Sequence, residues 1–146
     1  YAQNADRALD ALSAFAGVVE EPIVLVEVGY TSRPDAAVQP WLWPDEMHSV
    51  TVDEREQARA LSAIAGAAAA RPGVLGLFVW RYYANLDDVS QEAAWGFSPH
   101  AKLAEAALER IFARRWAADP ESRWGTWPPL GPRDRWPERS WGALSR

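Results

Sequence analysis

The chain has 146 residues, a net charge of −5, a hydrophobic fraction of 49% and no cysteine. This length and apolar content suit the core of one domain or of part of one, and the acidic balance argues against non-specific nucleic-acid binding. Disulfides and thiolate metal sites are excluded, the two histidines lack metal-site spacing, and no apolar run approaches the roughly 18 residues of a membrane span. We therefore expect no metal, no other cofactor, no nucleic-acid partner and no membrane span. We see no signal peptide, and the compartment stays open.

The first predicted elements are a helix over residues 4–17 and a strand over residues 23–28. Apolar residues recur at helical spacing in the first segment, and Gly17 is a plausible end. They are Ala8, Leu9, Leu12, Phe15 and Ala16. In the second segment five of the six residues are apolar, which predicts a strand buried on both faces, as in a parallel sheet.

Glu27 interrupts this apolar strand close to its end. An ionised carboxylate is costly to bury unless it is paired, hydrogen-bonded or next to a wet cleft. Gly29 follows and allows a sharp turn. In parallel α/β folds, functional groups lie at the carboxyl ends of the strands. Glu27 is therefore a candidate functional residue; the alternative is a structural carboxylate that caps a loop or pairs with an arginine.

The middle of the chain is predicted to contain a long loop and a second helix. Residues 29–52 are rich in proline and tryptophan, and loops of this size in a compact domain tend to be functional. Thr51 and Glu54 have capping-box spacing, which predicts a helix over residues 53–70. One face of that helix carries Gln57, Leu61, Ile64 and Ala68.

A second strand and a third helix complete the predicted elements. Residues 74–80 are nearly all apolar and predict a strand, and residues 81–97 form a second long loop. Ser98 as N-cap and Pro99 at the first helical position predict a helix over residues 99–117. Its expected inward residues are Leu103, Ala107, Leu108, Ile111 and Phe112.

The order helix, strand, helix, strand, helix predicts two parallel strands joined by a crossover helix. Two strands do not close a sheet, so the simplest interpretation is one segment of a larger α/β barrel. We divide the chain into a partial barrel domain at 1–117 and a tail at 118–146. The tail holds five of the eleven prolines and four of the nine tryptophans. It wraps over the domain, is a mobile end, or docks on a partner.

Nine tryptophans are an excess that suits carbohydrate binding. An indole offers a flat apolar face, which matches the C–H patches of a sugar ring, and an N–H donor for its hydroxyls. Most of these tryptophans are expected to be core or loop anchors. Trp41, Trp43 and Trp80 are the better candidates, because each follows or ends a predicted strand on the same face.

Five motifs follow one another over roughly residues 1–116. They are Val26-Glu27-Val28-Gly29-Tyr30, Ala36-Ala37 with Pro40-Trp41, Asp53 with Gln57, Phe78-Val79-Trp80, and Ser98-Pro99-His100-Ala101-Lys102-Leu103-Ala104-Glu105. In their order and spacing these motifs resemble the C-terminal portion of clan A glycoside hydrolases, most closely family 113, the β-mannanase-like group. The departures from the family pattern are Val26 for threonine, Ala101 for glycine, Leu103 for proline, and Arg81 where the family often continues with aromatics.

This resemblance implies α/β architecture, with residues 23–28 and 74–80 as strands seven and eight of a (β/α)8 TIM barrel. It implies that Glu27 is the catalytic nucleophile of a retaining glycoside hydrolase. Trp80 would line the sugar subsite next to the cleaved bond, and Tyr30, Trp41 and Trp43 would also bind substrate. The substrate class would be a β-linked polysaccharide or oligosaccharide, such as β-mannan.

A retaining glycosidase needs two carboxylates, and the resemblance places the acid/base glutamate on strand four, outside this chain. Four acidic residues lie in loops on the expected face: Asp45, Glu46, Asp87 and Asp88. We therefore expect the isolated chain to be inactive without the upstream half of the barrel. The open strand face, expected at Val24, Val26, Leu75 and Leu77, would bind that half or self-associate.

Two other functions are weighed. The chain could be a non-catalytic carbohydrate-binding or assembly fragment of a split or decayed barrel, with the tryptophans binding sugar without turnover. A flavodoxin-like nucleotide binder is disfavoured, because the turn after Glu27 lacks a glycine-rich phosphate loop.

Overall fold

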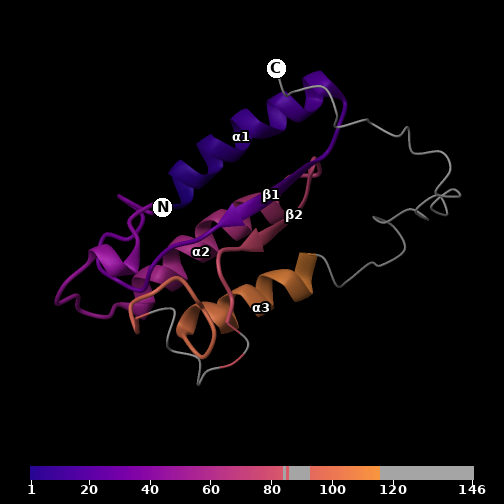
Figure 1. Ribbon diagram of the computed structural model, residues 1–146. Helices are drawn as coiled ribbons and strands as arrows, with labels where there is room; N and C mark the ends of the chain where they lie inside the picture. Colours follow the sequence, from indigo (N-terminus) through magenta and orange to yellow (C-terminus); the bar gives the residue numbers. More distant parts are fainter. Residues whose placement is uncertain (84, 86–92, 116–146) are drawn as a thin grey trace, which may run out of the picture.

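Two parallel strands and three α-helices make up the part of the chain that the computed structural model describes, residues 1–83, 85 and 93–115 (Figure 1). In chain order the elements are α1 (Ala2–Val19), β1 (Ile23–Val28), the short 3-10 helix η1 (Pro44–Glu46), α2 (Glu54–Ala69), β2 (Val74–Val79) and α3 (Leu103–Arg115). Every predicted strand and helix is present, with ends that differ by a few residues. The predicted tail, residues 118–146, lies outside the described residues.

The two strands pair in parallel, as predicted, with α2 as the connection between them. Ile23 pairs with Val74, Leu25 with Leu77, and Val28 with Val79. Between the last two pairs β1 advances by three residues while β2 advances by two. This register shift places one extra residue of β1 at positions 26 and 27, as in a β-bulge, and a second shift lies between Ile23 and Val24. A parallel β-α-β unit is the repeating unit of a TIM barrel, so the structure is compatible with one segment of such a barrel.

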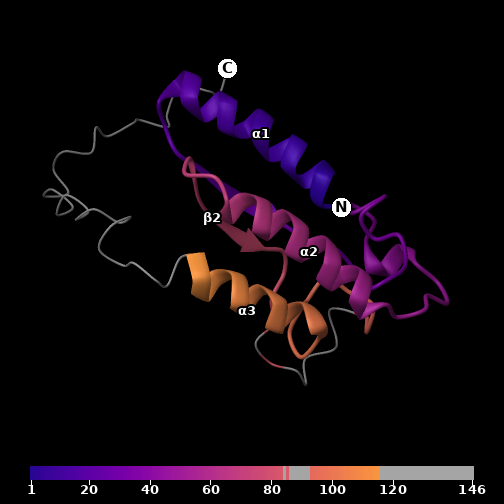
Figure 2. The ribbon, with the colours of Figure 1, turned by 180° about the vertical axis from the view of Figure 1, so that it is seen from behind.

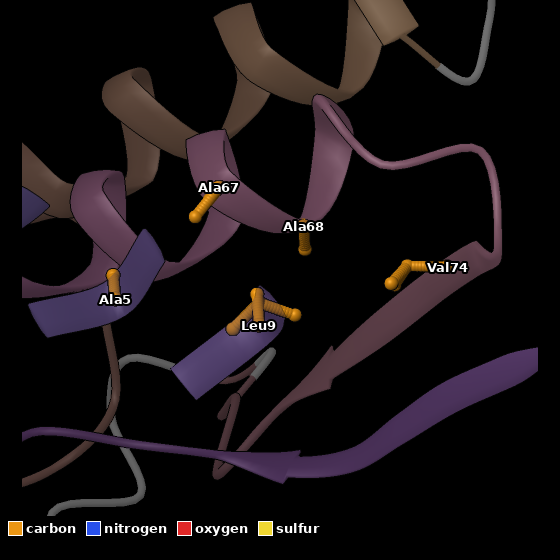
Figure 3. Close-up of a cluster of buried hydrophobic side chains, with 5 residues drawn as sticks. All are labelled: Ala5, Leu9, Ala67, Ala68 and Val74. Atoms are coloured by element: carbon orange, nitrogen blue, oxygen red, sulfur yellow. The ribbon is translucent and has the colours of Figure 1, made fainter. Parts of the chain in front are cut away.

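The helices lie on one face of this small sheet. The strands stand in front of α2 in Figure 1, and α2 lies in front of the strands in the reverse view of Figure 2. Beneath the helices, one core cluster joins α1, α2 and the start of β2 (Figure 3). Its buried members are Ala5, Leu9, Ala67, Ala68 and Val74. The alanines of α2 allow α1 to approach closely, and Leu9 fills the space between the elements.

A second cluster joins the end of β1 to α2 and α3. Its buried members are Val28, Leu61, Ala65, Ala104 and Leu108. Gln57, Leu61 and Ala68 are fully buried on α2, as the helical pattern predicts. The prediction for α1 holds at Leu9 and Ala16 and is wrong at Ala8, Leu12 and Phe15, which are exposed.

The opposite face of the sheet is open in the described structure, and we call it the open face. Val24, Val26 and Phe78 are exposed there, with Val26 72% and Phe78 65% accessible. The prediction that the first strand is buried on both faces is therefore wrong for this chain. The predicted membership of the open face is also wrong for Leu77, which packs against both core clusters, whereas Phe78 takes its place.

Helix ends depart from the predictions for identifiable reasons. Asp53, rather than Thr51, caps α2, because its carboxylate accepts a 3.0 Å hydrogen bond from the Glu56 N–H. Glu54 accepts a hydrogen bond from the Leu103 N–H at 3.1 Å and so caps α3 instead. α3 begins at Leu103 rather than at Pro99, because Ala101 has a left-handed backbone with φ 59°. Leu103 is exposed, contrary to the inward face predicted for it.

α1 runs through Gly17 to Val19 and ends at Glu20, which is left-handed. Within residues 1–83, 85 and 93–115, no helix combines the length and the apolar character needed to cross a membrane.

Candidate functional site

Glu27 faces the open side of the sheet because of the bulge. In a regular strand Glu27 would share the face of Leu25 and point at the helices. The bulge reverses this alternation, so Val28 packs into the helix-facing core while Val26 and Glu27 are both exposed. Bulges commonly redirect side chains next to functional sites. The predicted carboxylate thus lies near the carboxyl end of β1, on the side that the helices leave open.

All five predicted site residues line one cavity of about 820 Å³. They are Glu27, Tyr30, Trp41, Trp43 and Trp80. Its wall also includes Val24 and Val26 of the open face and Phe97 from the loop before α3. Leu9, Leu25 and Ile64 of the helix-facing core line it too, so the cavity extends to both sides of β1. The lining is mainly apolar and aromatic, with one carboxylate. This composition suits a ligand with both C–H faces and hydroxyl groups.

Trp43 and Trp80 form a corner of two aromatic rings. Their centroids are 6.3 Å apart and their planes meet at 88°. Trp43 also meets Phe97 edge-on, at 6.0 Å and 76°. Trp80 is 36% exposed and Trp43 42%, whereas Trp41 is 68% exposed. The corner is therefore held by neighbouring side chains, and Trp41 is the more open of the three rings.

The main chain of Trp80 is tied to β1. Its N–H donates to the Val28 carbonyl oxygen at 2.8 Å, and the peptide bond from Trp80 to Arg81 is cis. A Cβ placed on Gly29 would lie 2.3 Å from the Trp80 carbonyl oxygen. Gly29 is thus required for a close approach between the two strand ends, which carry Glu27 and Trp80.

Gln57 joins the two loops that carry the aromatic residues. From its buried position on α2, its Nε2 donates to the carbonyl oxygens of Tyr30 and Phe97, both at 2.9 Å. The Ser32 N–H also donates across the loops, to the Trp95 carbonyl oxygen at 2.7 Å. The loop that follows β1 and the loop before α3 are therefore held together by hydrogen bonds to each other and to Gln57 of α2.

Lys102 adds to this loop connection. Its Nζ donates to Ser32 Oγ at 2.8 Å and to the Gly96 carbonyl oxygen at 3.1 Å. The family resemblance singled out Gln57 and Lys102, but Ser32 and Phe97 were not predicted. Phe97 directly precedes Ser98 and Pro99, the predicted start of the third helix, and this is the one local feature that marks its position. Ser32 carries no sequence signal, because its partners are distant in the chain.

The protonation of Tyr30 follows from its surroundings. Burial raises the pKa of the Tyr30 phenol above its ordinary value of 10.0, because the phenolate loses its hydration. The hydroxyl therefore keeps its proton at neutral pH and can donate a hydrogen bond. In the cavity that Glu27 also lines, a neutral donor of this kind suits recognition of a sugar hydroxyl.

The loop acids contribute no second carboxylate to this cavity within the described residues. Asp45 and Glu46 lie exposed in η1 and are absent from the cavity lining, and Asp87 and Asp88 lie outside the described residues. In the described part of the chain no three histidine, aspartate or glutamate side chains are grouped so that they could hold a metal ion.

Comparison with known proteins bears on this arrangement. One solved structure, described as a complex of a family 113 β-1,4-mannanase, is 24% identical and superposes with a TM-score of 0.61. The match covers 76% of this chain and 35% of that one, so the chain spans about a third of the mannanase length. Comparison with curated proteins found no match. The sequence model of Glycoside Hydrolase Family 113 matches residues 1–102, which is most of the chain. The chain therefore belongs to glycoside hydrolase family 113.

Proposed function

We propose that this chain is the nucleophile-bearing, C-terminal part of a retaining glycoside hydrolase that acts on β-mannan-like polysaccharide or oligosaccharide. In this proposal β1 and β2 are the seventh and eighth strands of the barrel, and Glu27 is the nucleophile. The observation that carries it is the shared cavity, in which Glu27 lies with Tyr30, Trp41, Trp43 and Trp80. Membership of family 113 and the solved mannanase support the substrate class.

The proposed reaction has two steps. A carboxylate oxygen of Glu27 attacks the anomeric carbon, and the glycosidic C–O bond breaks as the leaving oxygen takes a proton from an acid. In the second step the acid, now a carboxylate, takes a proton from water, and this water attacks the anomeric carbon. The glycosyl ester with Glu27 breaks, the sugar leaves with retained configuration, and Glu27 is free again. A retaining pair stands about 5–5.5 Å apart. We assign the second carboxylate to the upstream half of the barrel, which would bind at the open face.

Each of the other groups has a role in this scheme. The Trp80 ring would stack on the sugar next to the cleaved bond, and the Trp43 ring would form the wall beside it. Trp41, which is the most exposed of the three, would contact a more distant sugar. The Tyr30 hydroxyl would donate to a sugar hydroxyl. These contacts orient the anomeric carbon toward Glu27, which is the main contribution that a rigid site makes to such a displacement.

The test compares the 146-residue chain with the natural polypeptide that contains it and the sequence upstream. Hydrolysis of β-1,4-mannan oligosaccharides is expected only from the joined form, because the loss of general acid–base assistance alone costs typically 10²–10⁴-fold. Glu27→Gln in the joined form should lower kcat by roughly 10⁴-fold. Glu21→Gln, a change of the same chemistry in the turn before β1, is the matched control and should leave kcat unchanged.

Other outcomes would change the assignment. Sugar binding without turnover in the joined form would favour the non-catalytic carbohydrate-binding alternative. Turnover by the isolated chain would mean that it supplies its own acid, and Asp45→Asn and Glu46→Gln would be the first variants to measure. Full activity of Glu27→Gln would overturn the nucleophile assignment.

A further inference from the structure

Arg81 lies at the centre of the aromatic residues without lining the cavity that they form. Its guanidinium carbon is 5.2 Å from the centroid of Trp43, 5.6 Å from Trp80 and 5.3 Å from Tyr83. Its Nη1 also donates to the Tyr83 hydroxyl. The described residues that line the cavity include Trp43 and Trp80 but not Arg81. Arg81 therefore contacts the two indoles from outside the space that a ligand would occupy.

These contacts connect two segments that are far apart in the chain. Trp80 and Arg81 directly follow β2, whereas Trp43 immediately precedes η1 in the loop after β1. The main chain of Trp80 is fixed by its hydrogen bond to Val28. Among the described residues, no main-chain hydrogen bond ties Trp43 to the sheet, and Arg81 contacts its ring as well as that of Trp80.

The nature of the contact explains what Arg81 does there. A guanidinium is planar and attracts the negative face of an aromatic ring, and the attraction grows when water is excluded. One cation in contact with two indoles favours an arrangement in which both rings stay close to it. The observed right angle between the rings, at 6.3 Å, is such an arrangement. Trp43 also contacts Phe97 on another side, at 6.0 Å and 76°.

We infer that Arg81 is a positioning residue, which sets the angle between Trp43 and Trp80 and so shapes the corner that receives one pyranose ring. The sugar-binding part of this inference rests on the proposed function. Arg81 itself makes no contact with the sugar. It holds the two indole planes at a right angle, so that one indole can stack on a flat C–H face of the sugar ring while the other contacts its edge.

The first measurement concerns ring geometry and needs no sugar. Two indoles held at close range give an exciton couplet in the ultraviolet circular dichroism of the 146-residue chain, and Trp43→Phe identifies it by difference. Arg81→Met, which keeps a long stem without the charge, should remove the couplet as Trp43→Phe does. Arg81→Lys, which keeps the charge without the plane, should retain part of it. Arg55→Met, on the exposed side of α2, is the control and should leave it intact.

The second measurement concerns affinity for a β-1,4-mannan oligosaccharide, by calorimetry, in the natural polypeptide carrying Glu27→Gln so that no turnover occurs. Arg81→Met should weaken binding by roughly threefold to tenfold, and Arg81→Lys by less. Thermal unfolding shows whether each variant is folded. If Arg81→Met is not folded, the affinity of Arg81→Lys tests the inference instead.

The possible outcomes separate the two proposals. An unchanged couplet in both Arg81 variants would overturn the positioning role. A lost couplet with unchanged affinity would overturn its link to sugar binding. If the unsubstituted site binds no mannan oligosaccharide and yet Arg81→Met loses the couplet, the proposed function fails while the positioning role of Arg81 stands.

Discussion

At the scale of single residues, Gly29 is required by its neighbour rather than by its own backbone conformation. Its φ is not positive, but the space where a side chain would begin is occupied by the Trp80 carbonyl. Backbone atoms cannot rotate away as a flexible side chain can. Any side chain at position 29 must therefore push the end of β2 away from the end of β1.

We predict that Gly29→Ala destabilises the fold by about 1–3 kcal/mol, the usual cost of overpacking. It should also displace Trp80 and change the indole spectra. Gly66→Ala is the matched control, because a Cβ there meets nothing within 4 Å and position 66 lies inside α2. That change should stabilise the fold by about 0.5–1 kcal/mol. Chemical denaturation of the two variants checks the opposite signs, and equal stabilities would contradict the close-approach argument.

Ala101 is a second residue whose backbone matters more than its side chain. Its φ of 59° is in the left-handed region, where an alanine Cβ is crowded. We predict that Ala101→Gly stabilises the fold by about 1 kcal/mol, because glycine removes that crowding. Ala106→Gly, on the exposed side of α3, should destabilise by about the same amount, so thermal unfolding of the pair distinguishes local strain from a general effect of glycine.

At the scale of elements, α2 connects the strands and also supports the loops above them. Gln57 reaches the main chain of both loops from one turn of the helix, and Asp53 begins that helix with its side-chain cap. The loops are therefore positioned by a rigid helix rather than by each other alone. This arrangement makes the aromatic site dependent on a side chain that no ligand would touch.

We predict that Gln57→Leu lowers the free energy of unfolding by about 1–3 kcal/mol, because buried carbonyl oxygens of Tyr30 and Phe97 lose a donor. Amide hydrogen exchange should become faster in both loops together. Gln3→Leu, on the exposed surface of α1, makes the same chemical change and should stay within about 0.5 kcal/mol of the unsubstituted chain. Faster exchange in one loop alone would show that Gln57 does not couple them.

The elements themselves were largely predictable from the sequence, and the reasons are local. The apolar run at β1 and the helical spacing in α2 depend on neighbouring residues only, so both were found with nearly correct ends. The start of α3 was missed because the left-handed Ala101 overrides the local Ser98-Pro99 signal. The bulge at Glu27 was missed because it depends on the register with β2, which no local pattern contains.

Among the site residues, those marked by local sequence features were predicted, and those that depend on contacts between distant segments were not. Glu27, Tyr30, Trp41, Trp43 and Trp80 were all predicted to be site residues, and all line one cavity, although their roles stay predictions. Sequence reasoning found them because strand ends and family motifs mark them. Ser32 and Phe97 were not found, since their importance arises from contacts between distant segments.

At the scale of the whole molecule, the dominant feature is a sheet that the described helices cover on one side only. Within residues 1–83, 85 and 93–115 the helices bury one face, whereas Val24, Val26 and Phe78 are accessible on the other. A two-stranded sheet with an uncovered apolar face is marginal in water. The chain therefore has a surface that gains free energy from any complementary apolar cover.

We predict that the isolated chain associates through this open face at micromolar concentration, with itself or with the upstream half of the barrel. Phe78→Glu should reduce the association, because a charge must then be desolvated at the contact. Val38→Glu is the control for added charge at a side chain of nearly equal exposure, in the loop after β1. Sedimentation velocity checks both, and a monomer at all concentrations without either substitution would contradict the prediction.

The bulge in β1 has a consequence for how the strand tolerates mutation. In a regular strand, consecutive positions face opposite sides, so a scan of substitutions affects activity at every second residue. Here Val26 and Glu27 emerge on the same side. In the proposed joined form, a saturation scan of β1 would then show two adjacent positions, 26 and 27, at which substitution lowers activity.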